Sequence, residues 1–466
     1  MESPQANSKR FHPWRGQPRG PGQLPLLALL LLQQLPLIGN PGYFSHDELQ
    51  WWARADVAAW RELPWIPWTD IAVFQYRPLT FNLWLILAHA LAAMPYLMHL
   101  VFVALGTANA LLLAACAERA GATRRVASCA AVLFVLMPYA AYTHGWTATL
   151  ADILVLGAGL LALRWLQGMN TSRGLPGSTL LIGAVVVGLI ITALLSKESA
   201  VVLPALLLAA LYRHPRRDIV FAVIATSALV VAIYLALRLG VILGTPHNGG
   251  AYAWSLGNVP RRLAEYLLFP FVPPMLEVGP LLAKSPARLA AAALCVTALL
   301  VALTSAGWRW PAAWFALVVT SLAPVLILDT SYDHYAYLAS AAAVGVTAVA
   351  WSRIHSAARV VILVVATIAL IHGAAIMLRI REVGGVQQRF HADLLQRLSG
   401  REQPLPIAPS NPADCWLLER FLADVPSYRG IPLDGRVHIV GCGGTAGAPA
   451  EAMMSSTGRL VDAPPG

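Results

Sequence analysis

Residues 79–94 have the sequence Leu-Thr-Phe-Asn-Leu-Trp-Leu-Ile-Leu-Ala-His-Ala-Leu-Ala-Ala-Met, and whether they cross a membrane decides the topology of the chain. The segment carries Asn82 and His89 and lies between Pro78 and Pro95. If it crossed, every later loop would change sides, and nearly all loop arginines would lie outside, against the positive-inside rule. We therefore predict a helix that lies in the membrane interface.

The composition around this segment indicates a polytopic membrane protein. Of the 466 residues, 58% are hydrophobic and 12% are charged, and the mean hydropathy is +0.62. Apolar runs of roughly 16 to 22 residues recur, and each is long enough for a helix to cross a hydrocarbon core. They are too continuous for a membrane β-barrel. We predict an all-α bundle of about eleven transmembrane helices, at residues 24–38, 98–117, 126–141, 148–166, 178–196, 198–212, 218–239, 286–305, 311–328, 335–352 and 359–378.

The positive charges fix the predicted sides of the membrane. The formal charge is +10, but Lys and Arg are spread through short loops, so we read them as topology signals and expect no nucleic-acid partner. Residues 1–23 are basic and rich in Pro and Gly, and we expect a disordered cytoplasmic N-terminus. A cleaved signal peptide is the alternative for residues 24–38, but Gln33 and Gln34 and the lack of a small-x-small cleavage site disfavour it.

The predicted external face collects three segments beside the transmembrane domain of residues 24–378. They are the first loop (about 39–97, with interfacial helices), a second long loop (about 240–285) and the tail of residues 379–466. The tail holds Cys415 and Cys442, which are candidates for a disulfide in an oxidising compartment. We also predict a separate helical stretch near residues 386–398 and a short strand-like run at residues 436–440. A small folded cap and a flexible tail are both open at this stage.

Ionisable residues on this face are the candidates for chemistry. Asp47 lies beside Glu48 just beyond the first span, and a carboxylate there can act as a general base on an acceptor hydroxyl or amine. Arg77, Lys197 and His334 are expected to face it and to hold the phosphate of a lipid-linked donor.

Simpler interpretations stay open for the same residues. The acidic pair is also typical of a solvated interface, and Arg77 of a side chain that reaches toward lipid head groups. Lys197 and Glu198 are compatible with an ion pair at a helical hairpin, and His334 with an aromatic belt. Neither a metal-binding motif nor a Gly-rich phosphate loop is present in the sequence.

Several short elements resemble, in order, the GT-C glycosyltransferases. They are the acidic pair in the first loop, Tyr76-Arg77-Pro78-Leu79, His99 with Asn109, Lys197-Glu198 before an apolar run with Pro204, and Asp333-His334-Tyr335-Ala336-Tyr337-Leu338. The similarity covers roughly residues 24–378 and is greatest to the membrane part of tetratricopeptide-repeat O-mannosyltransferases and their bacterial relatives.

The resemblance implies an inverting transferase that uses a polyprenyl-phosphate sugar as donor and a lipid, glycan or protein as acceptor. It implies a multi-pass protein of the bacterial inner membrane, in contact with membrane lipids, with the N-terminus cytoplasmic and the tail periplasmic. Asp47 would be the base and Glu48 its support, Asp152 a second acidic site, and Arg77, Lys197, His334, Tyr335 and Tyr337 the donor-binding residues. Family members differ in metal dependence, so a divalent cation is left open, and no other cofactor is expected.

The chain departs from the family at three points. His334 stands where an arginine is usual, which removes a permanent positive charge. Ala339 replaces a common proline, and the tail has no 34-residue repeat.

Two other functions stay open from the sequence. A transporter of lipid-linked sugar would be expected to show internal symmetry and ionisable residues near the bilayer midplane, and we find no convincing repeat. An O-antigen ligase or polymerase would use a large external loop, where Arg261-Arg262 lies.

Overall fold

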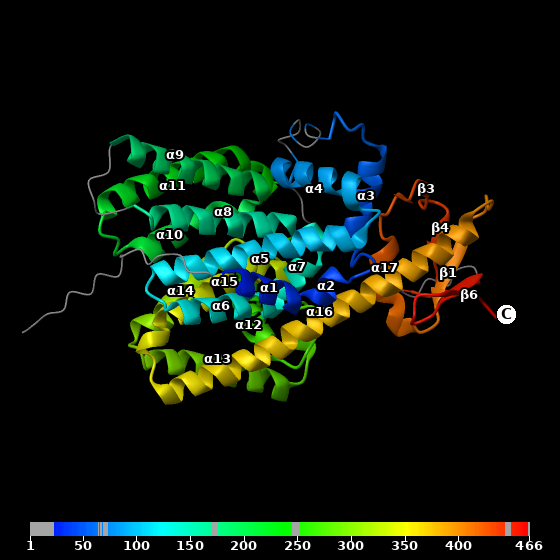
Figure 1. Cartoon of the computed structure of the whole chain (residues 1–466). Coiled ribbons are helices and arrows are strands. Elements are labelled where there is room, and N and C mark those ends of the chain that lie inside the picture. The colour runs from blue at the N-terminus through cyan, green and yellow to red at the C-terminus, as the bar shows by residue number, and fades with distance from the viewer. Residues whose placement is uncertain are drawn as a thin grey trace, which may run out of the picture.

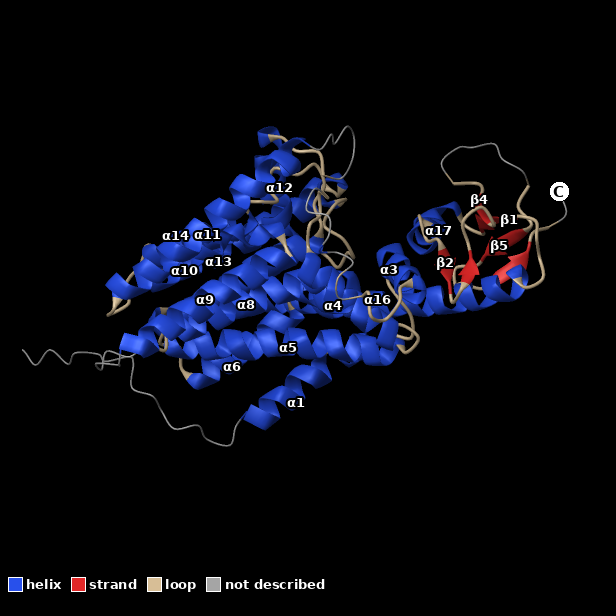
Figure 2. Ribbon diagram, turned by 90° about the horizontal axis from the view of Figure 1, so that it is seen from above, coloured by secondary structure: helices blue, strands red, loops and turns tan. Residues whose placement is uncertain are grey.

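The computed structural model describes residues 23–63, 65, 68, 73–169, 176–244, 252–442 and 449–464. It shows a helical bundle with a small domain of helices and strands at one end (Figures 1 and 2). The predicted disordered segment, residues 1–23, lies outside the described residues except for Gln23.

Within the described residues, seven helical segments are long and apolar enough to cross a membrane. Their main helices are α5 (Pro95–Arg119), α8 (Leu150–Leu166), α9 (Pro176–Ser196), α11 (Arg217–Gly244), α13 (Pro286–Thr304), α15 (Tyr337–Ala350) and α16 (Ser356–Leu398). The segment of α8 begins with the short helix η2 (Thr147–Thr149), and that of α15 includes η7 (Asp333–Ala336) before it and η8 (Trp351–Arg353) after it. The prediction of a polytopic helical protein is thus supported.

An eighth span is formed if two bent helices are counted as one. α6 (Arg124–Leu136) and α7 (Pro138–Gly145) meet at an angle of 61°. Pro138 explains the bend, because proline disfavours a helical conformation in the residue before it, and Met137 has an extended backbone.

Three predicted spans form helices shorter than expected. They are α1 (Gln23–Gln33) with α2 (Leu35–Ile38), η3 (Glu198–Val202) with α10 (Leu203–Leu211), and α14 (Arg309–Leu322). A 14-residue helix such as α14 is about 21 Å long, less than the ~30 Å hydrocarbon core. The predicted count of eleven is therefore not confirmed.

Residues 79–94 form α4 (Pro78–Leu91), a helix of 14 residues. Near its start, the Thr80 hydroxyl donates to the Ser196 carbonyl at the end of α9 (2.9 Å). Near its middle, the Trp84 indole donates to the Thr147 carbonyl, directly before α8 (2.6 Å), and the chain then turns into α5. At 14 residues, about 21 Å, this helix is shorter than the ~30 Å hydrocarbon core, and it contacts the bundle at the end where α8 begins and α9 ends.

The second long loop is structured where it is described. It contains η4 (Leu256–Asn258), α12 (Val259–Leu268), η5 (Phe269–Phe271) and η6 (Leu281–Ala283). Buried Glu265 pairs with both Arg261 and Arg262, and it accepts a hydrogen bond from the Ser331 hydroxyl. Arg262 also donates to the Leu328 carbonyl and the Ser331 hydroxyl, so Arg262 and Glu265 anchor the loop to residues just before η7, whereas Arg261 pairs with Glu265 within α12.

The tail is a folded domain. We predicted that the last span ends at residue 378 and that a separate helix follows near residues 386–398, and this is wrong. The two are one continuous helix, α16, whose 43 residues extend about 65 Å, which is longer than a single membrane crossing needs. No proline interrupts it, and Gly384 lets it pack tightly, since a Cβ there would lie 1.9 Å from Asn40 Oδ1.

A mixed sheet departs from the all-α prediction in this domain. The strand order is β4-β1-β5-β6, from β1 (Leu405–Pro409), β4 (Val437–Ile439), β5 (Ala452–Met454) and β6 (Leu460–Asp462), with β1 parallel to β4 and β5. Beside it lie η9 (Pro412–Asp414), α17 (Cys415–Leu422) and the hairpin of β2 (Ser427–Tyr428) and β3 (Ile431–Pro432). A disulfide joins Cys415 and Cys442, with their Cα atoms 5.7 Å apart.

Candidate functional site

The two neighbouring carboxylates of the first loop lie in different environments. Ser45 caps α3 (His46–Val57), and Glu48, at the third position of the helix, turns back to complete a capping box. Its Oε2 accepts hydrogen bonds from the backbone N–H groups of Phe44 and Ser45, at 2.6 and 2.9 Å. Its Oε1 accepts from the N–H and hydroxyl of Thr147, at 2.8 and 2.7 Å.

Glu48 therefore joins the start of α3 to the start of η2. It is fully buried, and burial raises its pKa to about 7, against the effect of its four hydrogen bonds. Because backbone and threonine donors occupy both oxygens, Glu48 fixes the start of α3, the helix that carries Asp47.

Asp47, in contrast, is accessible. Its side chain is 40% exposed and lies 3.5 Å from His46 Nε2. Burial first, then the charges of Tyr252 and Asp47, raise the pKa of Tyr332 to about 12. The exposed carboxylate of Asp47 can be reached by a ligand.

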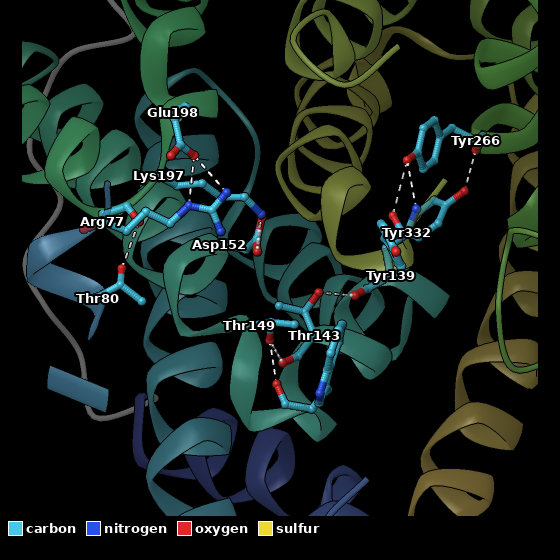
Figure 3. Close-up of polar contacts among 12 residues, drawn as sticks. Arg77, Thr80, Tyr139, Thr143, Thr149, Asp152, Lys197, Glu198, Tyr266 and Tyr332 are labelled. Atoms are coloured by element: carbon cyan, nitrogen blue, oxygen red, sulfur yellow. Dashed lines mark hydrogen bonds and ion pairs between the residues drawn. The ribbon is translucent and has the colours of Figure 1, made fainter. Parts of the chain in front are cut away.

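A cluster of four charged side chains lies where α4, α8 and α9 meet (Figure 3). Lys197 Nζ lies 2.7 Å from both oxygens of Asp152, and both side chains are buried. Arg77 contacts Glu198 Oε2 through Nε and Nη2, each at 2.8 Å. We call these four residues the ionic cluster.

The ionic cluster changes the predicted pairing. An ion pair between Lys197 and Glu198 was the alternative from sequence, but each residue has a different partner, contributed by α8 and by the residue before α4. Both cations are thus balanced by carboxylates. Glu198 takes two of the five N–H groups of Arg77, so an anionic ligand would share these cations with the carboxylates.

His334 lies beside the ionic cluster. Its ring contacts Trp146, Tyr332 and Tyr335, with centroid distances of 5.2, 5.7 and 4.4 Å. Lys197 Nζ lies 4.7 Å from the centroid of Tyr335, which places this ring between the histidine and the lysine. Tyr332 also packs edge-on against Tyr335, at 5.5 Å, so it belongs to the same aromatic group.

Several buried polar atoms in this region have no hydrogen-bond partner among the described residues. They include Trp146 Nε1, His334 Nδ1 and Glu198 Oε1, together with Asp333 Oδ1 and His46 Nδ1, which precede His334 and Asp47 in the chain. Buried polar atoms are nearly always paired, so such a group indicates a place for water or a polar ligand. Trp146 Nε1 can only donate, which suits a ligand oxygen.

Tyr337 does not join this site. Its hydroxyl lies 2.8 Å from His144 Nε2 and 3.3 Å from Asn109 Nδ2, deep in the bundle. His144 in turn contacts Gln34, at 2.7 Å. Tyr337 of α15 therefore contacts Asn109 of α5 and, through His144 of α7, is linked to Gln34 between α1 and α2. The predicted role of Tyr337 in donor binding has no support here.

The structure adds a residue that the sequence did not indicate. Arg420 of α17 forms an ion pair with Glu277 of the second long loop, and its guanidinium lies 4.3 Å from the centroid of Phe44. The Tyr142 hydroxyl donates to the same carboxylate, at 3.2 Å. The C-terminal domain thus places a cation next to the start of α3, from a residue 143 positions away from its partner.

A metal site is not evident in the part of the chain that the structure describes. There, no three His, Cys, Asp or Glu side chains are grouped in a way that could hold an ion.

Comparisons of the chain with protein-family models, curated proteins and solved structures found no match.

Proposed function

We propose that this protein is an inverting glycosyltransferase of the GT-C type, which moves one sugar from a polyprenyl-phosphate donor to a lipid, glycan or protein acceptor. We place it in the bacterial inner membrane with about eleven crossings, the N-terminus in the cytoplasm and the C-terminal domain in the periplasm. The observation that carries the proposal is a set of buried polar atoms without a hydrogen-bond partner among the described residues. They are Nδ1 of His334, Nε1 of Trp146, whose ring contacts His334, and Oε1 of Glu198 in the ionic cluster.

In the proposed reaction, Asp47 accepts a proton from the acceptor hydroxyl. The acceptor oxygen bonds to the anomeric carbon from the side opposite the phosphate. The bond from that carbon to the phosphate oxygen breaks, and its electron pair leaves with the polyprenyl phosphate. Lys197, Arg77 and the Trp146 N–H would stabilise the charge that develops on the leaving phosphate.

Asp47→Asn tests the assignment of the base. With radiolabelled polyprenyl-phosphate sugar and a lipid extract as acceptor source, we expect transfer to fall about 100-fold or more, because general-base catalysis typically contributes that much. Asp434→Asn, which removes an exposed carboxylate from the C-terminal domain, should leave the rate unchanged. Near-normal transfer by a membrane-inserted Asp47→Asn protein would contradict the role of Asp47.

Other donors and readouts separate the two other functions. Transfer of a preassembled glycan from a pyrophosphate carrier, without transfer from the polyprenyl-phosphate sugar, would indicate a ligase. Movement of the lipid-linked sugar across the membrane without transfer would indicate a transporter.

A further inference from the structure

A cavity of about 420 Å³ lies apart from the candidate site, between the first loop, the turn from α4 to α5, α16 and the β2–β3 hairpin. Its buried wall consists of aromatic rings and one amide, from Tyr43, Trp52, Tyr428 and Gln387. The Trp52 ring lies 5.8 Å from Tyr43 and 5.1 Å from Tyr428, which makes a continuous aromatic surface.

Part of the rim of the cavity is apolar and lies at the start of a helix that is long and apolar enough to cross a membrane. Met94, Tyr96 and Leu97 are 45–51% exposed and line the opening. Tyr96 and Leu97 belong to the first turn of α5, a membrane-spanning helix by length and composition. An amphiphile could therefore place its head group in the cavity and its chains along α5.

Arg429 supplies the charge of the cavity. Its guanidinium lies 5.9 Å from the centroid of Trp52 and 5.8 Å from that of Tyr428. Within the described residues it forms no ion pair, although eight other arginines do. Gln388, which is exposed, adds an amide to the same rim.

The backbone at Arg429 is unusual for an arginine. Arg429 and Gly430 form the two-residue turn between β2 and β3, with φ values of 50° and 75°. Such a turn favours Asn or Gly at its first position, because a Cβ is unfavourable at positive φ. Strained residues of this kind are concentrated at functional sites.

We propose that this cavity binds the head group of an anionic phospholipid. The phosphate would pair with Arg429, the Gln388 amide would donate to a head-group oxygen, and the acyl chains would run past Tyr96 and Leu97. Charge favours this occupant. The Arg429 guanidinium has no carboxylate partner in the part of the chain that the structure describes, and a cation near the end of a membrane-spanning helix complements a negatively charged lipid. The proposal does not rest on glycosyl transfer.

Arg429→Gly gives a sharp test, because glycine suits the turn and removes only the side chain. In native mass spectrometry of protein released from nanodiscs of phosphatidylglycerol and phosphatidylcholine, we expect wild type to retain phosphatidylglycerol. Retention should weaken about tenfold in Arg429→Gly, which corresponds to the loss of one charge-assisted contact. Arg124→Gln removes an exposed arginine at the start of α6 and should retain the lipid like wild type.

A second readout separates lipid binding from a structural role. Phosphatidylglycerol should raise the melting temperature of wild type in detergent and fail to do so for Arg429→Gly, since a ligand stabilises the state that it binds. Inorganic phosphate should not reproduce the shift. Equal retention by Arg429→Gly and wild type, equal retention of phosphatidylcholine, or full displacement by inorganic phosphate would each overturn the proposal.

Discussion

Replacement of Glu48 by glutamine should change how the stability of the protein depends on pH. Burial raises the pKa of this carboxyl from 4.5 to about 7, against the hydrogen bonds from Thr147, Phe44 and Ser45. A raised pKa means that the folded protein binds the proton more tightly than the unfolded chain does. The resulting stabilisation is complete below pH 4.5 and is lost as the pH rises to about 7.

The size of this effect follows from the two pKa values. Each pH unit corresponds to about 1.4 kcal/mol. The rise from 4.5 to about 7 therefore changes the free energy of unfolding by ~3 kcal/mol. Glutamine is neutral throughout and lacks this dependence. The NH₂ group of the glutamine would also face backbone N–H donors that now bond to a carboxyl oxygen of Glu48. The variant should therefore be less stable than wild type at low pH.

The assay is reversible unfolding by SDS in mixed micelles, from about pH 4 to pH 8, across the range of the linkage. We expect the difference in unfolding free energy between wild type and Glu48→Gln to narrow by about 3 kcal/mol over this range. Glu402→Gln removes an exposed acid and should differ from wild type by a constant amount. Parallel curves for wild type and Glu48→Gln would refute the reasoning.

Three further predictions concern contacts between distant segments. Lys197→Met should lower the free energy of unfolding by about 3–5 kcal/mol, because it removes the lysine that pairs with buried Asp152. Adding Asp152→Leu should recover most of this loss. Additive losses in the double variant would contradict the pairing. Arg420→Ala should speed amide hydrogen exchange in the loop that contains its carboxylate partner, with unchanged exchange in α11 as the control. Cys415→Ser should destabilise the C-terminal domain by ~3.5 kcal/mol, since the disulfide closes a loop of 27 residues. Cys442→Ser should cause the same loss of stability. Unequal losses in the two variants would count against the disulfide.

Residues 79–94 illustrate what could be predicted from the sequence. Its polar residues, its flanking prolines and the distribution of arginines predicted a helix that does not cross, and the structure gives a 14-residue helix. The same reasoning overestimated the helical length of other apolar runs. Residues 311–328 are apolar enough to suggest a span, but the helix there ends at Leu322, because hydrophobicity indicates burial in lipid or protein without fixing where a helix ends.

The tail was harder to predict for a different reason. Its strands are two to five residues long, and the sheet pairs β1 with β4 and β5 across more than 25 residues of chain. Such short strands carry little periodic signal. The sequence indicated a strand-like run at residues 436–440, where β4 lies, but no sheet order.

The amino-acid sequence by itself determined a helical membrane bundle, because long apolar runs in lipid must satisfy their own backbone hydrogen bonds. It also singled out Asp47, Arg77, Lys197 and His334 as unusual charges or polar groups near the membrane. Only the tertiary structure decided how they pair. Lys197 meets Asp152 across 45 residues and Arg77 meets Glu198 across 121. The packing of separate helices sets such contacts, and no local pattern in the chain encodes them.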